Sequence, residues 1–468
     1  MNKCLIKLCS ISINGIKNIN HGSLLFPCKD DYSSIAMTSN VIGIYGQNGS
    51  GKTAVVDSIR FLKTMMEGTP LPSDVSDYIN KKSNKANFVF EFYINSDLIE
   101  ATIFYEFSIL KSNESVEIIE EKVSYKEFEG NKQKRIKTLI DYSYNDISIN
   151  IEPDSRFNEL KKSDIKKDEK QNDVSVQLSV AHVISKKETK SFVFSQEFNN
   201  VWKHILNKEN DWIRILTPLH YYASEDLFII KNENQGLINL SAALPVSFKH
   251  QQKDSLSFGD MLVDLNNPIV VDKKQFTILE SIINEMNVIV EALIPSMNIS
   301  IKNYGESMTE EGEEGIRFEL LSKKDGYVIP LRHESEGIIK IISILSLLIE
   351  MYHNPSALIV IDEIDSGIFE YLLGEILKVL NETGKGQLLF TSHNLRPLEV
   401  LDKNSIYFTT TNPDKKFIQF PKVKQNNNLR KVYLRAINLG GQEEQVYKQT
   451  REGMIRRSFR KARVHNND

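Results

Sequence analysis

Gly46-Gln47-Asn48-Gly49-Ser50-Gly51-Lys52-Thr53 is the stretch that decides the fold of this 468-residue chain. It matches in full the phosphate-binding pattern GxxxxGK[ST], which works at the junction of a strand and a helix. Residues 41–45, VIGIY, form a short apolar run typical of a buried strand, and residues 54–66 carry apolar side chains at helical spacing. The order strand, loop, helix is therefore present, and the sequence predicts an α/β fold with a nucleotide-binding loop.

The residue types in this loop explain how it would hold a triphosphate. Its glycines let backbone amides approach a phosphate, and the helix that follows presents its positive end to the same anion. Lys52 would reach the β- and γ-phosphates, and the Thr53 hydroxyl would bind Mg²⁺. We therefore expect ATP and Mg²⁺ as the bound groups.

A second motif, Leu358-Ile359-Val360-Ile361-Asp362-Glu363, is an apolar strand that ends in two acids. Proteins with such a loop need a carboxylate for the metal ion beside the phosphates. Asp362 is the candidate metal ligand, and Glu363 is the candidate catalytic residue that would orient or deprotonate a water molecule. The alternative is a strand end that merely exposes two acids to solvent.

Two shorter motifs are candidates for the same site. His393 follows the apolar run at 387–391, and the carboxyl ends of parallel strands line the ligand crevice, so His393 is a candidate catalytic residue facing the γ-phosphate. Ser335-Glu336-Gly337 stands directly before an apolar helix predicted at 338–349. Ser335 can simply cap this helix, but a Ser hydroxyl and a Gly amide there also form a γ-phosphate socket, which makes Ser335 and Gly337 candidate nucleotide-binding residues.

The composition is that of an ordinary folded protein. Hydrophobic residues make up 41% and charged residues 26%, which argues against wholesale disorder, collagen and long coiled coils. A net charge of -4 means that any nucleic-acid contact must be a local patch. Cys4, Cys9 and Cys28 show no metal-site spacing, and no signal peptide or long apolar run is evident, so we expect reduced thiols, no membrane contact and a cytoplasmic protein.

The two ends of the chain resemble one another in composition and differ from the middle. Strand-like runs from residue 87 to 125 indicate an antiparallel β lobe, while apolar strands and helices alternate after residue 316. The predicted division has five parts. These are an N-terminal half of a nucleotide-binding head at 1–126, a polar linker or insertion at 127–176, a helical insertion at 177–300, the C-terminal half of the head at 301–427, and a basic segment at 428–468.

These motifs resemble those of the ABC-type ATPases, namely the SMC, Rad50 and RecF group and the OLD-like AAA ATPases of phage defence. The resemblance covers roughly residues 1–125 and 316–421, with the middle as a variable insertion. It implies homo-oligomers in which two heads sandwich ATP, so that Ser335 and Gly337 of one head face the nucleotide on Lys52 of the other. The signature Leu-Ser-Gly-Gly-Gln is reduced here to its Ser and second Gly, Asp365-Ser366-Gly367 resembles the D-loop in position, and Lys17 is similar to a phosphate-facing basic residue.

The resemblance also implies a role. The 74 residues after Asn394 show no DxD pair of a TOPRIM nuclease, and the middle of the chain shows no long heptad arms. The chain thus resembles the stand-alone ATPase subunit of two-component anti-phage systems, PARIS more than Septu, with a separate toxic or nuclease effector and a phage protein or DNA as trigger. The alternative is a RecF-like repair ATPase that binds DNA through the basic segment; a transporter ATPase is disfavoured by the weak signature.

Overall fold

The computed structural model describes most of the chain. The described residues are 4–26, 40–112, 115–130, 132–144, 150–156, 158, 160, 174–203, 209–230, 243–252, 255–309, 312–420, 428–440 and 442–462. Cys28 and the end of the basic segment lie outside them. No helix within this described part is both long and apolar enough to cross a membrane.

A six-stranded sheet at the centre carries the glycine-rich loop. Its strand order is β10-β17-β18-β3-β19-β20, and all neighbours are parallel except the last pair. The strands are β3 Asn40–Tyr45, β10 Leu227–Ile230, β17 Leu358–Ile361, β18 Gln387–Thr391, β19 Ile406–Thr409 and β20 Phe417–Ile418. The strand that precedes the loop, β3, therefore lies between two strands that come from the far end of the chain. This confirms the α/β fold class.

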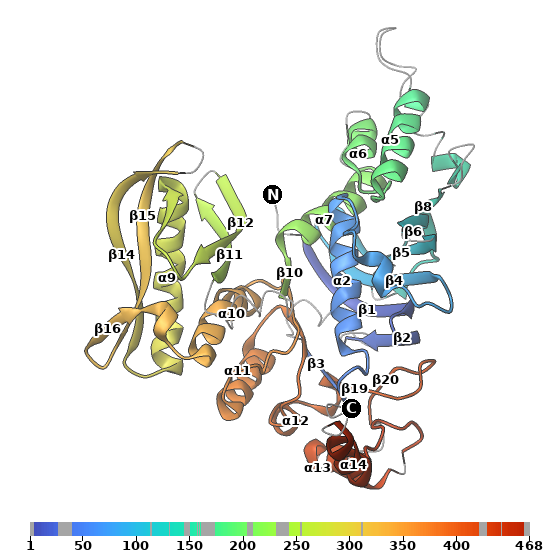
Figure 1. The fold of residues 1–468 in the computed structure, drawn as a ribbon. Helices are drawn as coiled ribbons and strands as arrows, with labels where there is room; N and C mark the ends of the chain where they lie inside the picture. Colours follow the sequence, from blue (N-terminus) through green and yellow to red (C-terminus); the bar gives the residue numbers. More distant parts are fainter. Residues whose placement is uncertain are drawn as a thin grey trace, which may run out of the picture.

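Both faces of this sheet are covered, which explains why its strands are continuously apolar. Ile42 and Ile44 on one face belong to the same apolar core as helix α2 (Lys52–Glu67). Val41 and Tyr45 on the other face belong to a second core. The helices of that second core are α10 Glu336–His353, α11 Glu370–Thr383, α12 Pro397–Val400 and α13 Leu429–Leu439. Figure 1 shows α2 and α11 in separate layers of the molecule.

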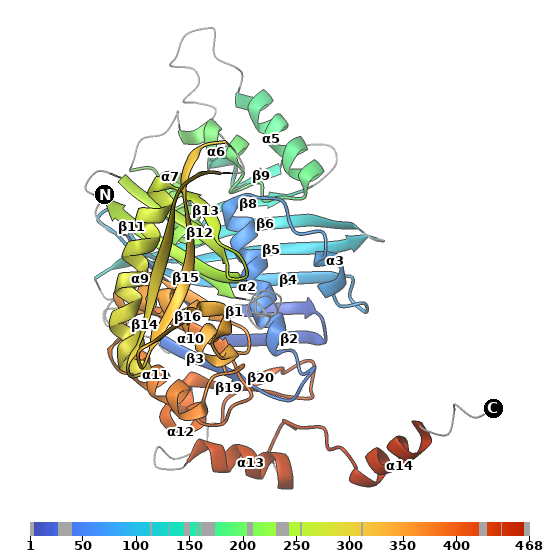
Figure 2. The same cartoon turned by 60° about the vertical axis from the view of Figure 1, so that its left-hand side comes forward.

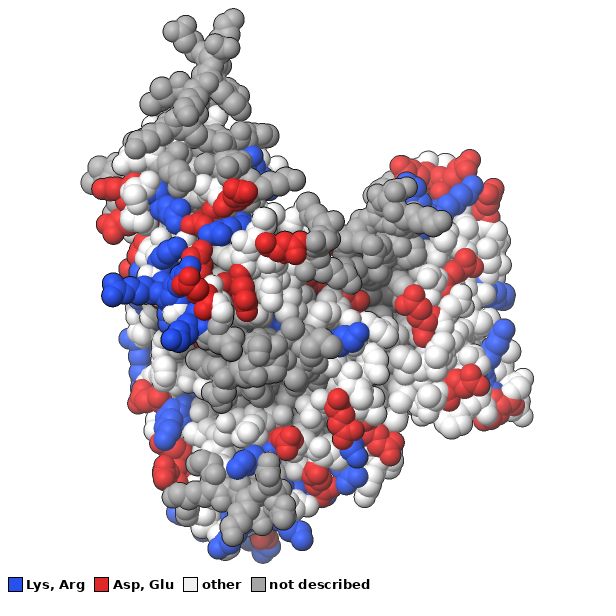
Figure 3. Space-filling model, turned by 180° about the vertical axis from the view of Figure 1, so that it is seen from behind, with Lys and Arg blue, Asp and Glu red and all other residues white. Residues whose placement is uncertain are grey.

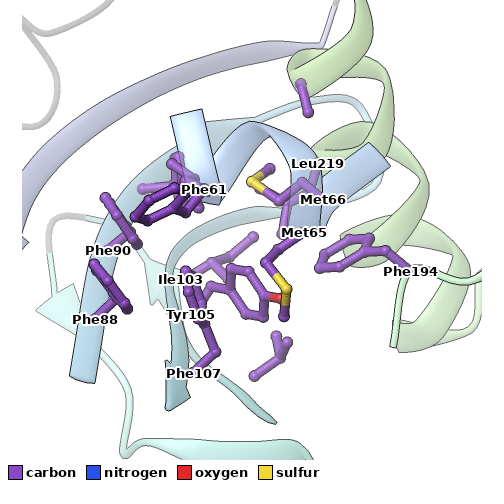
Figure 4. Close-up of a cluster of buried hydrophobic side chains, with 14 of the residues drawn as sticks. Phe61, Met65, Met66, Phe88, Phe90, Ile103, Tyr105, Phe107, Phe194 and Leu219 are labelled. Carbon is purple, nitrogen blue, oxygen red and sulfur yellow. The ribbon is translucent and has the colours of Figure 1, made fainter. Parts of the chain in front are cut away.

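An antiparallel sheet packs on the other side of α2 and forms the predicted β lobe. Its order is β2-β1-β4-β5-β6-β8-β9, with β7 paired to β6 (Figure 2). The strands are β1 Leu5–Ile16, β2 Ile19–Leu25, β4 Lys85–Asn95, β5 Glu100–Ser112, β6 Ser115–Glu129, β7 Lys132–Gln133, β8 Lys137–Ser143 and β9 Asn150–Glu152. Phe61 and Met65 of α2 insert among Phe88, Tyr105 and other aromatic residues of this sheet (Figure 4).

A side chain of the parallel sheet ties the two sheets together. Gln387 at the start of β18 is buried; its Oε1 accepts from the Leu8 amide at 2.8 Å and its Nε2 donates to the Leu8 carbonyl at 2.8 Å. The register of β1 shifts between Leu8 and Ser10, so a side-chain amide can reach the backbone of β1 at this point. These bonds therefore fix the first strand of the chain to a strand that lies almost 400 residues further along the sequence.

The Gln387→Leu variant is expected to melt well below the wild type. The substitution leaves the buried amide and carbonyl of Leu8 without these partners, at a cost of about 2 kcal/mol or more. Gln419→Leu is the matched control, because the side chain of Gln419 donates to the Asn404 carbonyl at an exposed position. Equal thermal melting curves for the two variants would contradict the prediction.

A third unit stands on the side of α10 that faces away from the parallel sheet. It contains α9 Lys273–Leu293, the strands β13 Ile269–Asp272, β14 Met297–Met308, β15 Glu314–Lys324 and β16 Tyr327–Pro330, and the hairpin of β11 Ala243–Gln252 and β12 Ser255–Asp264. Its core includes Ile339 and Ile342 of α10. Helix α10 is consequently packed on two sides, which explains its long apolar run.

The middle of the chain differs from the prediction of a polar linker followed by a helical insertion. Within 127–176, β8 and β9 extend the antiparallel sheet. Around 177–300, the helices α5 Val174–Glu188, α6 Gln196–Lys203 and α7 Asp211–Glu225 follow one another, and the strands β10 to β13 separate α7 from α9. Strand β10 is an edge strand of the central parallel sheet. Four-residue apolar strands such as β10 carry too little periodicity to be separated from helical sequence.

The basic segment at 428–468 is also not one unit. Helix α13 packs on the core, with the Tyr433 ring stacked 4.6 Å from that of Phe408. Helix α14 (Glu452–Ala462) buries none of its residues. In Figure 2 it extends away from the body of the molecule. The basic residues of α14 are therefore exposed, as are Lys431 and Arg435 on α13.

Candidate functional site

The glycine-rich loop is held in shape by residues from both ends of the chain. A Cβ on Gly46 would lie 1.7 Å from Thr409 Oγ1, so only glycine fits there. Thr409 donates its hydroxyl to Ser50 Oγ at 2.7 Å, and Asn18 Nδ2 donates to the Gly49 carbonyl at 2.7 Å. Gly51 has φ of +100°, a conformation that favours glycine, and stands at the N-terminus of α2. The loop therefore turns sharply from β3 into the helix.

The loop geometry fits a triphosphate. Asn48 and Gly49 are exposed, and a Cβ built on Gly49 would meet no atom within 4 Å, so the outer side of the loop is open. Lys52 folds back, and its Nζ donates to the carbonyls of Gly46 at 2.9 Å and Gln47 at 3.3 Å. Burial lowers the pKa of Lys52, and the nearby acids partly offset this. The ammonium thus already lies in the loop, where phosphate oxygens can replace these carbonyls.

The two predicted metal ligands lie side by side although 309 positions separate them. The Thr53 hydroxyl is 3.5 Å from Asp362 Oδ1, and the Thr391 hydroxyl donates to the same oxygen at 2.6 Å. Asp362 is almost wholly buried; burial raises the pKa of its carboxyl, and the bonds from Thr391 and Thr53 act in the opposite direction. A hydroxyl and a carboxylate oxygen are suited to Mg²⁺, which would neutralise phosphate charge here.

Glu363 is held in an unusual backbone conformation directly after β17. Its φ of +49° is rare for a residue with a side chain, and such strain concentrates at functional sites. Its amide donates to Thr391 Oγ1 at 2.7 Å, while the Thr391 hydroxyl donates to Asp362. The single hydroxyl of Thr391 therefore positions both the Asp362 carboxylate and the Glu363 backbone. Its position in the strand-end motif was visible in the sequence, but this role was not predicted.

His393 lies at the edge of the same group of residues. Its amide and that of Asn394 both donate to Asp365 Oδ2, at 3.1 and 2.9 Å. Partial burial is the main cause that lowers the pKa of the imidazole, and the positive charge of Lys52 lowers it further. The ring therefore lies within the electrostatic field of Lys52 and the acids.

The motif at 335–337 begins at an exposed surface and contacts the turn at residues 362–367, which we call the acidic turn. Ser335 caps α10 by accepting the Ile338 amide at 3.4 Å, and both Ser335 and Glu336 are exposed. A Cβ on Gly337 would lie 2.2 Å from the Gly367 carbonyl, so the first turn of α10 packs directly on the turn that follows the two acids. In the described part of the chain no hydrogen bond links Ser335 or Gly337 to the loop at 46–53 of the same molecule.

Other contacts at the site were not foreseen from the sequence. The side chain of Gln47 accepts the Lys448 amide at 2.7 Å, so the C-terminal segment touches the loop. Lys17, expected to face a phosphate, instead places its Nζ 2.5 Å from Asp57 of α2. The neighbouring Asn18 is the residue that reaches the loop. Pairing across such distances in sequence leaves no local pattern to find.

Lys340 of α10 is the most unusual charged residue near the site. Its side chain is fully buried, and its Nζ has no hydrogen-bond partner among the residues that the structure describes. Burial lowers the pKa of the ammonium to about 8, against the attraction of Asp365, Glu363 and Asp362, in that order. The same three acids act on Lys52 from the loop. The acids therefore lie in the field of two lysines that come from different helices.

This arrangement is an α/β head in which a P-loop and two strand-end acids lie at one edge of a mainly parallel sheet. Residues 41–399 match the family model described as "AAA domain, putative AbiEii toxin, Type IV TA system". The match spans most of the chain, and the chain belongs to this family. A comparison with curated protein sequences finds no match.

Among solved structures, the chain is similar to SMC head domains. An SMC head bound to the C-winged helix domain of ScpA is 13% identical with a TM-score of 0.43, covering 88% of this chain and 97% of that chain. A Pyrococcus furiosus Smc head with an extended coiled coil, bound to the C-terminal domain of ScpA, is 14% identical with a TM-score of 0.41, covering 89% and 96%. The SMC head of Thermotoga maritima is 13% identical with a TM-score of 0.35, covering 88% and 99%.

Proposed function

We propose that this chain is a switch ATPase that binds and hydrolyses ATP between two copies of its head. The observation that carries the proposal is the grouping of Lys52, Thr53, Asp362 and Glu363 at the carboxyl ends of β3 and β17. Lys52 and the loop amides would hold the phosphates, and Thr53 and Asp362 would hold Mg²⁺. Glu363 would orient and deprotonate the attacking water, with His393 beside the γ-phosphate.

The exposed start of α10 supports action between two copies. Ser335 and Glu336 face solvent at a helix N-terminus, where amides and a hydroxyl are available to an anion. Gly337 connects this surface to the acidic turn through Gly367. A second head that placed its Ser335 and Gly337 against the nucleotide would add donors and exclude water. ATP would then hold the heads together, and hydrolysis would release them.

The Ser335→Arg variant tests the pairing. A bulky cation at the proposed socket is expected to abolish ATP-dependent association while leaving the monomer folded, because Ser335 is exposed. Light scattering after size-exclusion chromatography, with and without ATP and Mg²⁺, measures the change. Ser224→Arg is the control, since Ser224 is an exposed helical serine on α7. Unchanged association of Ser335→Arg would argue against the socket.

We place this switch in anti-phage defence, where it would hold or release a separate effector protein on sensing a phage protein or nucleic acid. The support is the family match, whose description names a putative AbiEii toxin of a Type IV TA system. Helix α14 offers a surface for such a partner, because Met454 and Phe459 are 63% and 78% exposed beside basic residues. Co-purification with the products of neighbouring genes, with and without ATP, tests the assignment. A stable effector complex that responds to ATP is expected.

A RecF-like role in DNA repair is the second candidate, favoured by the exposed basic residues of α14. These are Arg456, Arg457, Arg460 and Lys461. On the face shown in Figure 3, acidic and basic side chains are intermingled. Salt-dependent DNA binding that is lost when these four residues become Gln would favour repair. Loss of effector co-purification in the same variant would favour the defence role.

A further inference from the structure

Lys340 lies on the face of α10 that meets the acidic turn. It is three residues from Gly337 and therefore shares a helix face with it, and Gly337 packs on Gly367 at the end of that turn. One turn further along, Ile344 joins the apolar core of the parallel sheet. The long Lys340 side chain is thus enclosed between α10 and the sheet, with no exposed surface of its own.

An enclosed ammonium without a hydrogen-bond partner is costly, and a position that keeps one calls for an explanation. The acidic turn supplies the negative charges that lie near this ammonium. Asp365 uses Oδ2 to hold the amides of His393 and Asn394, whereas its Oδ1 is buried and has no hydrogen-bond partner among the described residues. The Lys340 ammonium and this oxygen are opposite charges in one buried region, outside ion-pair distance of each other.

We infer that Lys340 is a positioning residue, which couples the start of α10 to the acidic turn and so fixes where that turn presents Glu363 for hydrolysis. Asp362, Glu363 and Asp365 lie within four positions and repel one another. Lys52 can offset this repulsion, but it is also the residue that a phosphate would engage. Lys340 has no exposed surface, so a bound phosphate would not draw its ammonium away from the acids.

Lys340 would therefore connect the proposed socket at Ser335 with the turn that carries Glu363. The exposed socket at Ser335 begins the helix that carries Lys340, and Asp365 connects the acidic turn to the backbone at His393. A shift of α10 when a second head binds Ser335 would therefore move the Lys340 charge relative to Glu363. This inference rests on the proposed ATP hydrolysis, and it names Lys340 and helix α10 as the parts of the chain that would control it.

Lys340→Met and Lys340→Arg test the role. Met keeps the length of the side chain without its charge, so kcat for ATP is expected to fall about tenfold or more while KM stays within about threefold. Lys340→Arg retains the charge and should recover much of kcat. The melting temperature of Lys340→Met should equal or exceed that of the wild type, because an ammonium without a hydrogen-bond partner has left the interior. A merely structural lysine would show the reverse pattern of lower stability and normal kcat.

Lys7→Met is the matched control. Lys7 is also fully buried, but its Nζ donates to the Lys385 carbonyl at 2.9 Å, away from the site. This variant should lose stability and keep kcat. Equal kcat in the wild type and Lys340→Met would overturn the role of Lys340 alone. A wild-type chain that fails to hydrolyse ATP would overturn the proposed function and this role with it.

Discussion

Replacing Glu363 with Gln is expected to slow ATP hydrolysis by about 10²–10⁴-fold while ATP still binds. The amide retains the size and hydrogen-bonding reach of the carboxylate but cannot accept a proton from water. The backbone at Glu363 is fixed by the bond of its amide to Thr391 and by its positive φ, so the new side chain should occupy the same place. The loop that grips the phosphates is not touched by the change.

Phosphate release under single-turnover and steady-state conditions measures the effect. If hydrolysis is what separates the heads, the Glu363→Gln protein should also accumulate as an ATP-bound dimer. Glu375→Gln on the exposed face of α11 is the control for the same chemical change and should behave as the wild type. Turnover at the wild-type rate by Glu363→Gln would remove Glu363 from its assigned role.

Lys52→Ala is expected to abolish nucleotide binding, with affinity weakened by about 100-fold or more. Hydrogen bonds to a charged group are worth about 1.5–3 kcal/mol each, and Lys52 already points its ammonium into the loop, 2.9 Å from the Gly46 carbonyl. Isothermal titration calorimetry with ATP and Mg²⁺ measures the loss. The wild type should also gain thermal stability as the ATP concentration rises, and the variant should not, because only a bound ligand stabilises the folded state.

The folded state of Lys52→Ala needs a separate check, because Lys52 is buried. Lys63 lies on the same helix, and Lys63→Ala removes the 2.7 Å hydrogen bond from its Nζ to the Leu227 carbonyl. It is therefore a matched control that should bind ATP normally. Nucleotide binding by Lys52→Ala with wild-type affinity would contradict the assignment of residues 46–53 as the site.

The parts of the site that could be predicted from the sequence are those in which contiguous residues encode both conformation and chemistry. Residues 46–53 and 358–363 are of this kind, because a strand and the loop after it place functional groups at one sheet edge. Asn18 reaches Gly49 across 31 positions, Thr409 reaches Ser50 across 359, and Lys340 lies on a different element from the acids. Each looks like an ordinary polar residue in its own segment. These residues come close together because of the order of the strands in the sheets. The hydrophobic pattern of a single segment does not predict that order.

The same distinction explains the errors in the domain division. The polar composition around residues 127–176 is typical of a linker, yet β8 pairs with β6 and buries Leu139, Ile140 and Tyr142. An antiparallel strand can leave its other residues polar and partly exposed, so three apolar residues are enough to bury it in the sheet. Leu227–Ile230 was placed in a helical insertion because four apolar residues have no period to measure.

The position of β3 in its sheet affects how the protein is made. Strand β3 ends at Tyr45, but its neighbours β18 and β19 end at Thr391 and Thr409. At a ribosomal rate of ~5–20 residues per second, roughly 20–70 s pass between the synthesis of β3 and that of β19. During that time an apolar strand and the loop after it wait without their partners, exposed to chaperones and proteases. A chain interrupted before β18 would carry the entire glycine-rich motif and still be unable to grip a nucleotide.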